Sequence, residues 1–388
     1  MPDPKALRRI VEARFPRFLA ELESLVNIDC GSYTADGVNR VADVVSGVLA
    51  ELGAEVERTS HHPAEGRPQL GDLVIGRLAG EGPRLLLIGH MDTVFDPGTV
   101  AARPYRAEDD RATGPGVTDM KAGLLAGLHA VAALHEAGSR PAITFVANPD
   151  EEVGSPFSTP VIRSLVAQHD VALVLECARA NGDIVSARKG IADYHLELVG
   201  RAAHAGVEPE KGRSAILEAA HQVLALHALN GRWPTVTVNA GVIHGGTRPN
   251  VVAERCELQV DVRAATADAF AAVSAEVERL AGSRTVDGVK AGLSRSAGHP
   301  PMEKTYASAR LVALAVAIAA ELGFELHDAA TGGASDANTT AALGLPTLDG
   351  LGPVGGDDHS ADEWLDLASV VPRTTLLAGL IGSVGEAL

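Results

Sequence analysis

The chain has 388 residues, which is more than one ordinary domain requires and favours two domains. A hydrophobic content of 46% with 21% charged residues is typical of a globular protein, and Gly and Pro are spread along the chain rather than gathered in a disordered tail. The net charge of −17, without a basic patch, argues against a nucleic-acid partner.

The N-terminal segment has charged residues throughout its apolar periodicity. It therefore predicts an amphipathic helix over residues 6–26 rather than a signal peptide, and a cytoplasmic protein is expected. No stretch of about 20 uncharged apolar residues follows, and residues 311–320 are too few to span a bilayer, so no membrane partner is expected. A second helix is predicted over residues 38–52, and a strand at 54–58.

Two sets of residues invite a metal interpretation that the sequence does not support. His61 and His62 lie in a Pro/Gly-rich connection without a nearby acidic partner, so a solvent-exposed loop is favoured. The three cysteines are far apart, which argues against a disulfide framework. Cys177 at a strand end is more often a small packed residue than a ligand.

Three short apolar runs, at residues 85–88, 143–147 and 171–175, are typical of strands buried in a parallel sheet. Each run is followed by side chains that can bind a metal ion: His90 and Asp92, then Asp150, Glu151 and Glu152, then Glu176. Ligand sites of open α/β sheets lie outside the carboxyl ends of the strands. The sequence therefore predicts one crevice that contains a metal site.

Two further candidates come from other segments. Asp119 precedes an Ala/Leu-rich helix predicted over residues 121–136, where an aspartate is also common as an N-cap. The constrained Gly-Pro-Gly approach at residues 114–116 favours the functional interpretation. Near the end of the chain, His359 follows a glycine-rich loop that would bring it to the same edge of the sheet.

The residue pattern of the sequence changes near residues 186–190. A βαββα-like block follows, with predicted strands at 193–199, 235–242 and 256–262 and helices at 214–229 and 267–280. A Gly/Pro stretch at 296–301 closes this block, and a helical pattern resumes over 307–322. We therefore predict an α/β fold: a catalytic domain of residues 1–188 and 301–388 with a mixed, mainly parallel sheet, and a smaller inserted α+β domain of residues 189–300.

These candidates would suit two divalent ions about 3.5 to 4 Å apart. Asp119 is the best bridge between the ions, because it lies between the other ligands in sequence and at a helix start. His90 and Glu176 would complete one site, and Glu152 and His359 the other, which leaves a position open for water. Ligation by imidazole and carboxylate suits zinc, cobalt or manganese.

The remaining carboxylates have different expected roles. Glu151 and Glu152 would point in different directions in an extended segment, so Glu151 is free to act as the general base. Asp92 is placed to accept the free ring N–H of His90 and hold the imidazole. Alone, the Glu pair would be interpreted as a solvated charged loop.

The ordered motifs HMDTV, GPGVTDMKAG, DEEVGS, VLEC, AHAG and GGDDHS span nearly the whole chain. Together they resemble the di-zinc peptidase and deacylase family that includes glutamate carboxypeptidase, acetylornithine deacetylase and succinyl-diaminopimelate desuccinylase. The glutamate at position 176 and the segment TGGASDAN are most similar to the glutamate carboxypeptidases. The resemblance implies the same five ligands, the same base and the same role for Asp92.

The resemblance also implies that the inserted domain is a lid that forms a homodimer. His204, helped by Asn250, would stabilise the oxyanion in the partner subunit's active site. Arg263 and the Gly332-Gly333 loop match places that hold the substrate carboxylate or shape its pocket. In one departure, His299 stands where the glutamate carboxypeptidase has an arginine, and a neutral imidazole is a poorer carboxylate clamp. Arg295 is a candidate substitute.

The expected function is hydrolysis of an amide bond next to a free carboxylate, in a small peptide or N-acyl amino acid, with two ions that are expected to be Zn²⁺ (alternatively Co²⁺ or Mn²⁺). The alternative enzymes are an N-acyl-amino-acid deacylase and a dipeptidase. A non-catalytic metal- or peptide-binding protein is the alternative from another class, but it would leave Glu151 without a role. No G-x-S-x-G elbow or Walker loop is present, which argues against serine hydrolysis and nucleotide dependence.

Overall fold

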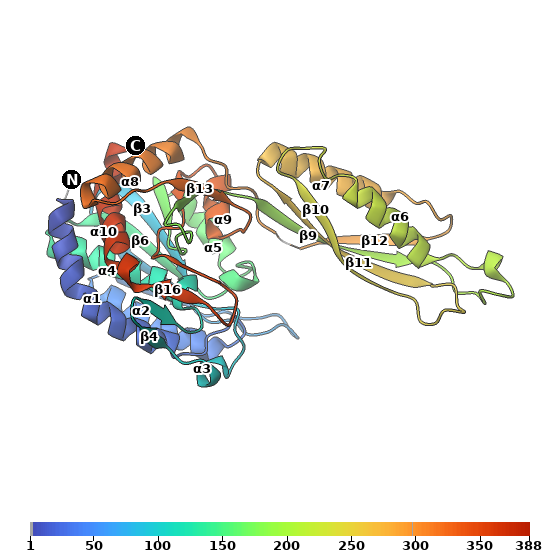
Figure 1. Ribbon diagram of the computed structural model, residues 1–388, viewed down its shortest axis with the longest axis horizontal. Helices are drawn as coiled ribbons and strands as arrows, with labels where there is room; N and C mark the ends of the chain where they lie inside the picture. Colours follow the sequence, from blue (N-terminus) through green and yellow to red (C-terminus); the bar gives the residue numbers. More distant parts are fainter. Residues whose placement is uncertain (1–2, 297) are drawn as a thin grey trace. The chain divides into compact units, whose positions relative to one another are not determined.

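The computed structural model describes residues 3–296 and 298–388 of the chain (Figure 1). The chain divides into two compact units. Unit 1 consists of Met1–Ser186, Lys304–Ala330 and Ser335–Leu388, and unit 2 of Ala187–Glu303 and Thr331–Ala334. The expected inserted domain of residues 189–300 lies within unit 2, which also takes the short segment Thr331–Ala334.

Unit 1 contains a six-stranded sheet that is mixed and mainly parallel, as predicted. Its strands in spatial order are β1 (Glu55–Thr59), β2 (Leu73–Leu78), β6 (Pro141–Asn148), β3 (Glu81–His90), β7 (Val171–Val174) and β14 (Thr347–Leu348). The strands from β6 to β14 run parallel to one another, whereas β2 is antiparallel to β6 and β1 to β2. The carboxyl ends of β6, β3, β7 and β14 therefore meet at one edge.

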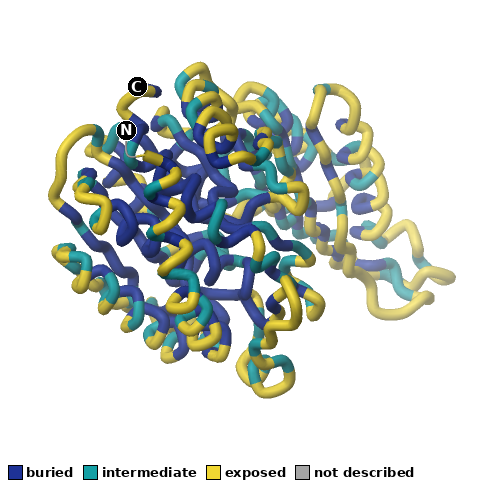
Figure 2. Tube along the Cα trace, turned by 60° about the vertical axis from the view of Figure 1, so that its left-hand side comes forward, coloured by how far each residue is buried: buried dark blue, intermediate teal, exposed yellow. Residues whose placement is uncertain are grey.

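Apolar side chains fix the position of β3 in the middle of this sheet. Residues 85–88 are each at most 1% exposed, since neighbouring strands and helices cover both faces. Figure 2 shows the buried parts of unit 1 gathered inside a shell of exposed turns. A continuous apolar run is what such a strand requires.

The helices of unit 1 pack on this core. They are α1 (Pro4–Val26), α2 (Ala35–Glu51), α3 (Thr99–Ala102), α4 (Ala122–Glu136), α5 (Thr159–Val166), α8 (Tyr306–Leu322), α9 (Asp336–Ala342) and α10 (Leu367–Ser383). By length and composition alone, two helical segments, Val117–Glu136 and Leu367–Glu386, are long and apolar enough to cross a membrane. The most apolar windows of these segments are 94% and 72% buried, respectively. Contacts between α1, α4 and α10 account for this apolar character.

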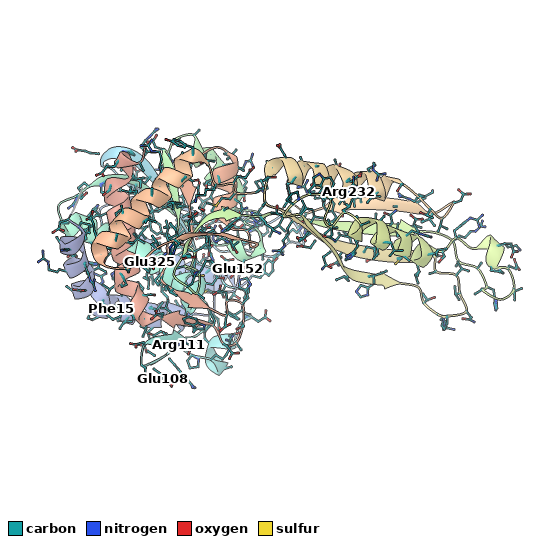
Figure 3. All side chains as sticks on the ribbon, turned by 45° about the horizontal axis from the view of Figure 1, so that its top comes forward. Phe15, Glu108, Arg111, Glu152, Arg232 and Glu325 are labelled. Atoms are coloured by element: carbon teal, nitrogen blue, oxygen red, sulfur yellow. The ribbon has the colours of Figure 1, made fainter. Side chains whose placement is uncertain are left out.

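A second, small antiparallel sheet of unit 1 was not anticipated from the sequence. It consists of β15 (Gly355–Gly356), β16 (Trp364–Asp366), β5 (Arg111–Thr113) and β4 (Arg106–Glu108). The loop of residues 114–119 follows β5, and the loop of residues 357–363 connects β15 to β16. Arg111, labelled with Glu108 in Figure 3, stacks at 4.3 Å over the ring of Trp364. The two loops that carry the predicted ligands Asp119 and His359 therefore start from one sheet.

Unit 2 is a βαββαβ fold with one antiparallel sheet and its own core. Its elements in chain order are β9 (Gly190–Val199), α6 (Ala215–His227), β10 (Thr237–Gly245), β11 (Arg255–Ala264), α7 (Ala267–Gly282) and β12 (Lys290–Arg295). The spatial order of the strands is β10-β11-β9-β12, so β10 and β12 are edges. Strand β12 was not predicted, because Lys290–Arg295 offers little apolar alternation. Strands β8 (Ile184–Arg188) and β13 (Asp328–Thr331) form a separate pair.

Candidate metal centre

The carboxyl edge of the large sheet brings together the predicted ligands of unit 1. His90 is the last residue of β3, and Glu176 follows β7 by two residues. The loop after β6 carries Glu151 and Glu152, and the two loops of the small sheet add Asp119 and His359. His61 and His62 do not belong to this cluster. His61 is half-buried and its ring lies against the ring of Phe157 in a tilted arrangement, with 4.9 Å between centroids, whereas His62 is exposed.

The two carboxylate oxygens of Asp119 face different histidines. Oδ1 lies 3.1 Å from Nε2 of His90, and Oδ2 lies 3.0 Å from Nε2 of His359. Glu176 joins the first histidine, with Oε1 3.8 Å from Nε2 of His90, and Glu152 joins the second, with Oε2 3.2 Å from Nε2 of His359. Glu176 thus lies beside His90, Glu152 lies beside His359, and Asp119 lies between the two histidines.

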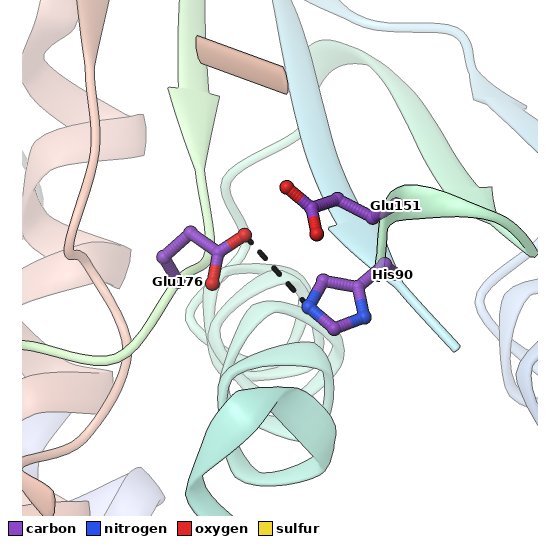
Figure 4. A group of neighbouring side chains, drawn as sticks. All are labelled: His90, Glu151 and Glu176. Carbon is purple, nitrogen blue, oxygen red and sulfur yellow. Dashed lines mark ion pairs between the residues drawn. The ribbon is translucent and has the colours of Figure 1, made fainter. Parts of the chain in front are cut away.

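Glu151 lies on the side of His90 and Glu176. Ligand atoms of these three residues are all within 4.8 Å of one another, and the same holds for His90, Asp119 and Glu152. Figure 4 shows the carboxyl groups of Glu151 and Glu176 turned toward the His90 ring. Glu151 can therefore reach the same space as the ligands.

The expectation that Glu151 and Glu152 lie in an extended segment is wrong. They begin a short 3₁₀ helix, Glu151–Val153. With about three residues per turn, consecutive side chains still point in different directions. The division between a ligand and a base therefore remains possible on a helical backbone.

Asp92 holds this turn and the ring of His90. Its carboxylate accepts the backbone N–H groups of Glu151 and Glu152, both at 3.2 Å, and the hydroxyl of Ser32 at 2.7 Å. Nδ1 of His90 lies 2.9 Å from the main-chain oxygen of Asp92 and 3.4 Å from its Oδ1, so the carbonyl is the closer acceptor. A proton on Nδ1 leaves the lone pair of Nε2 directed at the site. Ser32 was missed, since no motif marks it.

Negative charge is in excess at the cluster. Burial lowers the pKa of His90, but hydrogen bonds to Asp119 and Asp92 and the charge of Glu176 outweigh burial and raise that pKa well above its ordinary value. Hydrogen bonds to Asp119 and Glu152 raise the pKa of His359 to about 11.

The carboxyl groups respond in both directions. Burial, reinforced by the charge of Glu176, raises the pKa of Glu151 well above its ordinary value, and burial raises the pKa of Glu152. Burial alone would raise the pKa of Asp119, but hydrogen bonds from His359 and His90 lower it. A site that retains protons for lack of positive charge is one where divalent cations can replace them.

The donor set fits metal ions. Oε1 of Glu152 is buried and has no hydrogen-bond partner among the described residues, although its Oε2 faces His359. An unpartnered buried carboxylate oxygen is rare in proteins unless it binds an ion or water. Oxygen and imidazole ligands without thiolate match zinc, cobalt or manganese.

Two buried carboxylates near the ligands were missed from the sequence. Asp336, the first residue of α9, accepts the hydroxyl of Ser155 at 2.7 Å and a hydrogen bond from the side-chain amide of Asn148, and burial raises its pKa to about 7. It thereby ties together both ends of the Glu151 loop. Glu363 is 1% exposed, and burial raises its pKa to about 7. Both contact partners distant in sequence, so no local pattern marks them.

The predicted substrate residues all belong to unit 2 and form two groups. His204 and Asn250 are both exposed and lie side by side, since the N–H of Ala205 donates to the carbonyl of Asn250 at 3.0 Å. Arg263 donates to the carbonyl of Gly332 at 2.9 Å and also pairs with Asp261 at 3.1 Å.

Gly333, His299 and Arg295, which the sequence also singled out, have the following surroundings. The carbonyl of Gly333 accepts from Arg188 at 3.2 Å. Burial lowers the pKa of His299, which favours its neutral form. The guanidinium of Arg295 lies over the rings of Phe270 and Tyr194, at 5.3 and 5.6 Å from their centroids.

The fold and the site define a metal-dependent hydrolase. Residues 86–383 match the profile of Peptidase family M20/M25/M40, and the chain belongs to this family. It is 32% identical over 376 residues to carboxypeptidase G2 of Pseudomonas sp. (strain RS-16), which covers 95% of this chain and 90% of the relative. It is 27% identical over 358 residues to succinyl-diaminopimelate desuccinylase of Leptothrix cholodnii, covering 85% and 89%.

Solved structures share the fold. Aminopeptidase PepT from Bacillus cereus superposes with a TM-score of 0.77 at 24% identity, covering 95% of this chain and 98% of that chain. The M20 family metallo-carboxypeptidase Sso-CP2 from Sulfolobus solfataricus has a TM-score of 0.74 at 15% identity, covering 95% and 99%.

Proposed function

We propose that the chain is a two-metal carboxypeptidase-like enzyme that cleaves an amide bond next to a free carboxylate. The observation that carries the proposal is Asp119, whose two oxygens face two histidines at 3.1 and 3.0 Å. One carboxylate in that position can serve two ions. Zn²⁺ is the proposed metal, with Co²⁺ and Mn²⁺ as alternatives.

Each residue of the site then has a chemical task. When bound, the two ions supply Lewis acidity that polarises the substrate carbonyl and makes water more acidic. Glu151 accepts the proton of the attacking water and returns it to the leaving amine. Its carboxylate reaches the same space as the ligand atoms of His90 and Glu176, so it lies within reach of such a water. Asp92 keeps the turn of Glu151 and the His90 ring in place.

The proposed substrate is a small peptide or N-acyl amino acid with a free carboxylate. Carboxypeptidase G2 is the relative at 32% identity, which supports a carboxypeptidase. Arg263, tied to the Gly332–Gly333 loop, is the proposed contact for the substrate carboxylate. Asp261 offsets part of the charge of Arg263, and burial lowers the pKa of His299 and so favours its neutral form, which leaves the substrate carboxylate without a strong second cation from these residues. A deacylase is the second candidate, supported by the desuccinylase relative.

We further propose that the enzyme is a homodimer formed through unit 2. The support is a group of exposed apolar side chains on α6 and on the edge strand β10: Ile216 (42% exposed), Leu217 (51%), Leu224 (72%) and Ile243 (51%). A bare edge strand beside apolar side chains is a surface that natural proteins usually cover. A cytoplasmic location stays a proposal that rests on the sequence.

The decisive experiment is a release assay over a panel of N-acyl amino acids and dipeptides, with the enzyme reconstituted with Zn²⁺. Release of a free amino acid by the wild type, and not by Glu151→Gln at equal metal content, supports the proposal. Metal binding without release of any product would instead support the non-catalytic alternative.

A further inference from the structure

Glu363 contacts the backbone of the loop that carries Asp119. Its Oε1 accepts the N–H groups of Thr118 at 2.9 Å and Asp119 at 3.1 Å, and its Oε2 accepts the N–H of Gly116 at 2.9 Å. The side chain is almost fully buried. Both carboxylate oxygens are therefore committed to the protein backbone, and Glu363 is not a sixth ligand.

The loop needs such a partner because no regular structure holds it. Helix α4 begins only at Ala122, and the backbone dihedral angles of Asp119 (φ −112°, ψ 93°) and Met120 (φ −129°, ψ 37°) are not helical. Buried backbone N–H groups in this conformation have no helical or strand acceptors and must find others. Glu363 supplies one acceptor group for three of them.

Strand pairing brings Glu363 to the loop. Glu363 directly precedes β16, and the first pair of β16 with β5 is Trp364 with Thr113. Thr113 in turn directly precedes the loop. The antiparallel register therefore places the carboxylate beside the amides that follow β5.

A buried lysine holds the same loop through its carbonyl groups. Nζ of Lys121 donates to the carbonyl of Pro115 at 2.9 Å and to that of Ile28 at 3.2 Å. Lys121 is 1% exposed. Glu363 thus accepts hydrogen bonds from amides of the loop, and Lys121 donates a hydrogen bond to one of its carbonyl groups.

We infer that Glu363 is a positioning residue that sets the direction of the Asp119 carboxylate, so that one oxygen is presented to each metal ion. The inference rests on the proposed two-metal function. The two oxygens belong to one rigid carboxylate, so rotating it displaces both of them from the positions that face His90 and His359, and the consequence falls on both ions together. Residues that orient a ligand typically change metal affinity by about 10- to 100-fold when they are replaced.

The test compares Glu363→Gln with a matched control in unit 2. Glu218 is also fully buried, and its carboxylate accepts the N–H groups of Thr285 at 2.9 Å and Val286 at 2.7 Å. Glu218→Gln removes the same charge from backbone amides that support no ligand. This variant therefore shows how the loss of a buried carboxylate that holds backbone amides affects the protein when no metal ligand is involved.

Mn²⁺ alone is the probe, added to metal-free full-length protein. Calorimetry gives the number of ions and their affinity, and electron paramagnetic resonance reports the magnetic coupling that a bridging carboxylate transmits between two Mn²⁺ ions. Glu363→Gln should bind both ions about 10- to 100-fold more weakly and show altered coupling. Glu218→Gln should leave both the ion affinity and the magnetic coupling unchanged, even if its melting temperature falls as far as that of Glu363→Gln.

Three results would overturn the inference. The first is that wild type binds two coupled ions and Glu363→Gln matches it. The second is an equal loss of affinity in Glu218→Gln. If Glu363→Gln does not fold, Glu363→Asp takes its place, because the shorter side chain keeps the charge but moves it away from the loop. The third result is that Glu363→Asp binds both ions with unchanged affinity. A wild type that binds fewer than two ions would instead remove the two-metal proposal itself, and the inference with it.

Discussion

Nε2 of His359 lies 3.0 Å from Oδ2 of Asp119, although 240 residues separate them in the chain. His359 has a left-handed backbone, with φ of 62°, in the turn that leads away from β15. Histidine and aspartate adopt this conformation more readily than bulky residues do. The turn aims the imidazole at the oxygen of Asp119 that does not face His90.

This geometry predicts different metal losses in two variants. Asp119→Ala should lose both ions, because each ion would lose one of its ligands, whereas His359→Ala should mainly weaken the ion shared with Glu152. Metal analysis of the purified, dialysed variants measures the difference. Equal partial loss in both variants would contradict a bridge at Asp119.

Glu151→Gln should nearly abolish turnover and leave both ions bound. The amide keeps the shape of the side chain but cannot accept the proton of water, and loss of a general base lowers kcat by roughly 10²- to 10⁴-fold. Steady-state kinetics at a verified content of two ions per chain provides the measurement. Activity within a few-fold of wild type would exclude this residue as the base.

His204→Ala should lose roughly 10²- to 10³-fold in kcat without losing metal, as expected for removal of an oxyanion donor. Because the proposed role is in the partner subunit's site, mixing inactive His204→Ala with inactive Glu151→Gln should restore activity. Random exchange makes half of the dimers mixed, each with one intact site of two, so recovery should reach about a quarter of wild type.

The mixing experiment requires proof that subunits exchange, for which two distinguishable affinity tags suffice. Mixed dimers that form and stay inactive would show that His204 does not act across the dimer. Chains that remain monomeric at assay concentrations would count against the proposed dimer instead.

The free energy of unfolding should depend on pH through Glu21 of α1. Burial would raise its pKa, but hydrogen bonds from His129 of α4, at 2.7 Å, and from Arg17 outweigh burial and lower it. A carboxyl whose pKa is lowered by folding adds stability above its unfolded-state pKa, and that stability is lost as the pH falls through the folded-state value. Glu21→Gln should therefore reduce the free energy of unfolding by about 1.5 kcal/mol at pH 7, with the difference shrinking below about pH 4.

Urea denaturation between pH 3 and 7 measures this effect. Glu12, which pairs with Arg8 on the exposed side of the same helix, is the matched control. Glu12→Gln should change stability by no more than about 0.5 kcal/mol, because exposed pairs are screened by solvent. A difference between Glu21→Gln and wild type that persists unchanged at pH 3 would contradict the role of the Glu21 charge.

The sequence predicted the parts of the fold whose pattern is local. Apolar runs placed β3, β6 and β7, and the side chains that follow them gave most of the ligands, because strand ends determine where those residues lie. Helix α10 was missed since it is buried on nearly all sides and has Pro372 in its interior, so no amphipathic period marks it. Strand β2 was missed as well, although it fixes the antiparallel edge of the sheet.

The supporting residues of the site could not be predicted in this way. Ser32, Asp336 and Glu363 make their contacts through pairing of segments that are distant in sequence. A short strand such as Trp364–Asp366 has too few residues to reveal a period, yet its register decides where Glu363 lies. Such contacts follow from tertiary structure alone.

The contact between Glu363 and the N–H of Asp119 spans 244 residues, and the whole of unit 2 lies between the two in the chain. During synthesis, Asp119 is made long before Glu363 and His359. A growing chain thus holds most of the ligands but neither the second histidine nor the carboxylate that orients the bridge. On the proposed assignment, hydrolytic competence should arrive only with the last segment of unit 1, and an unfinished chain should be inactive.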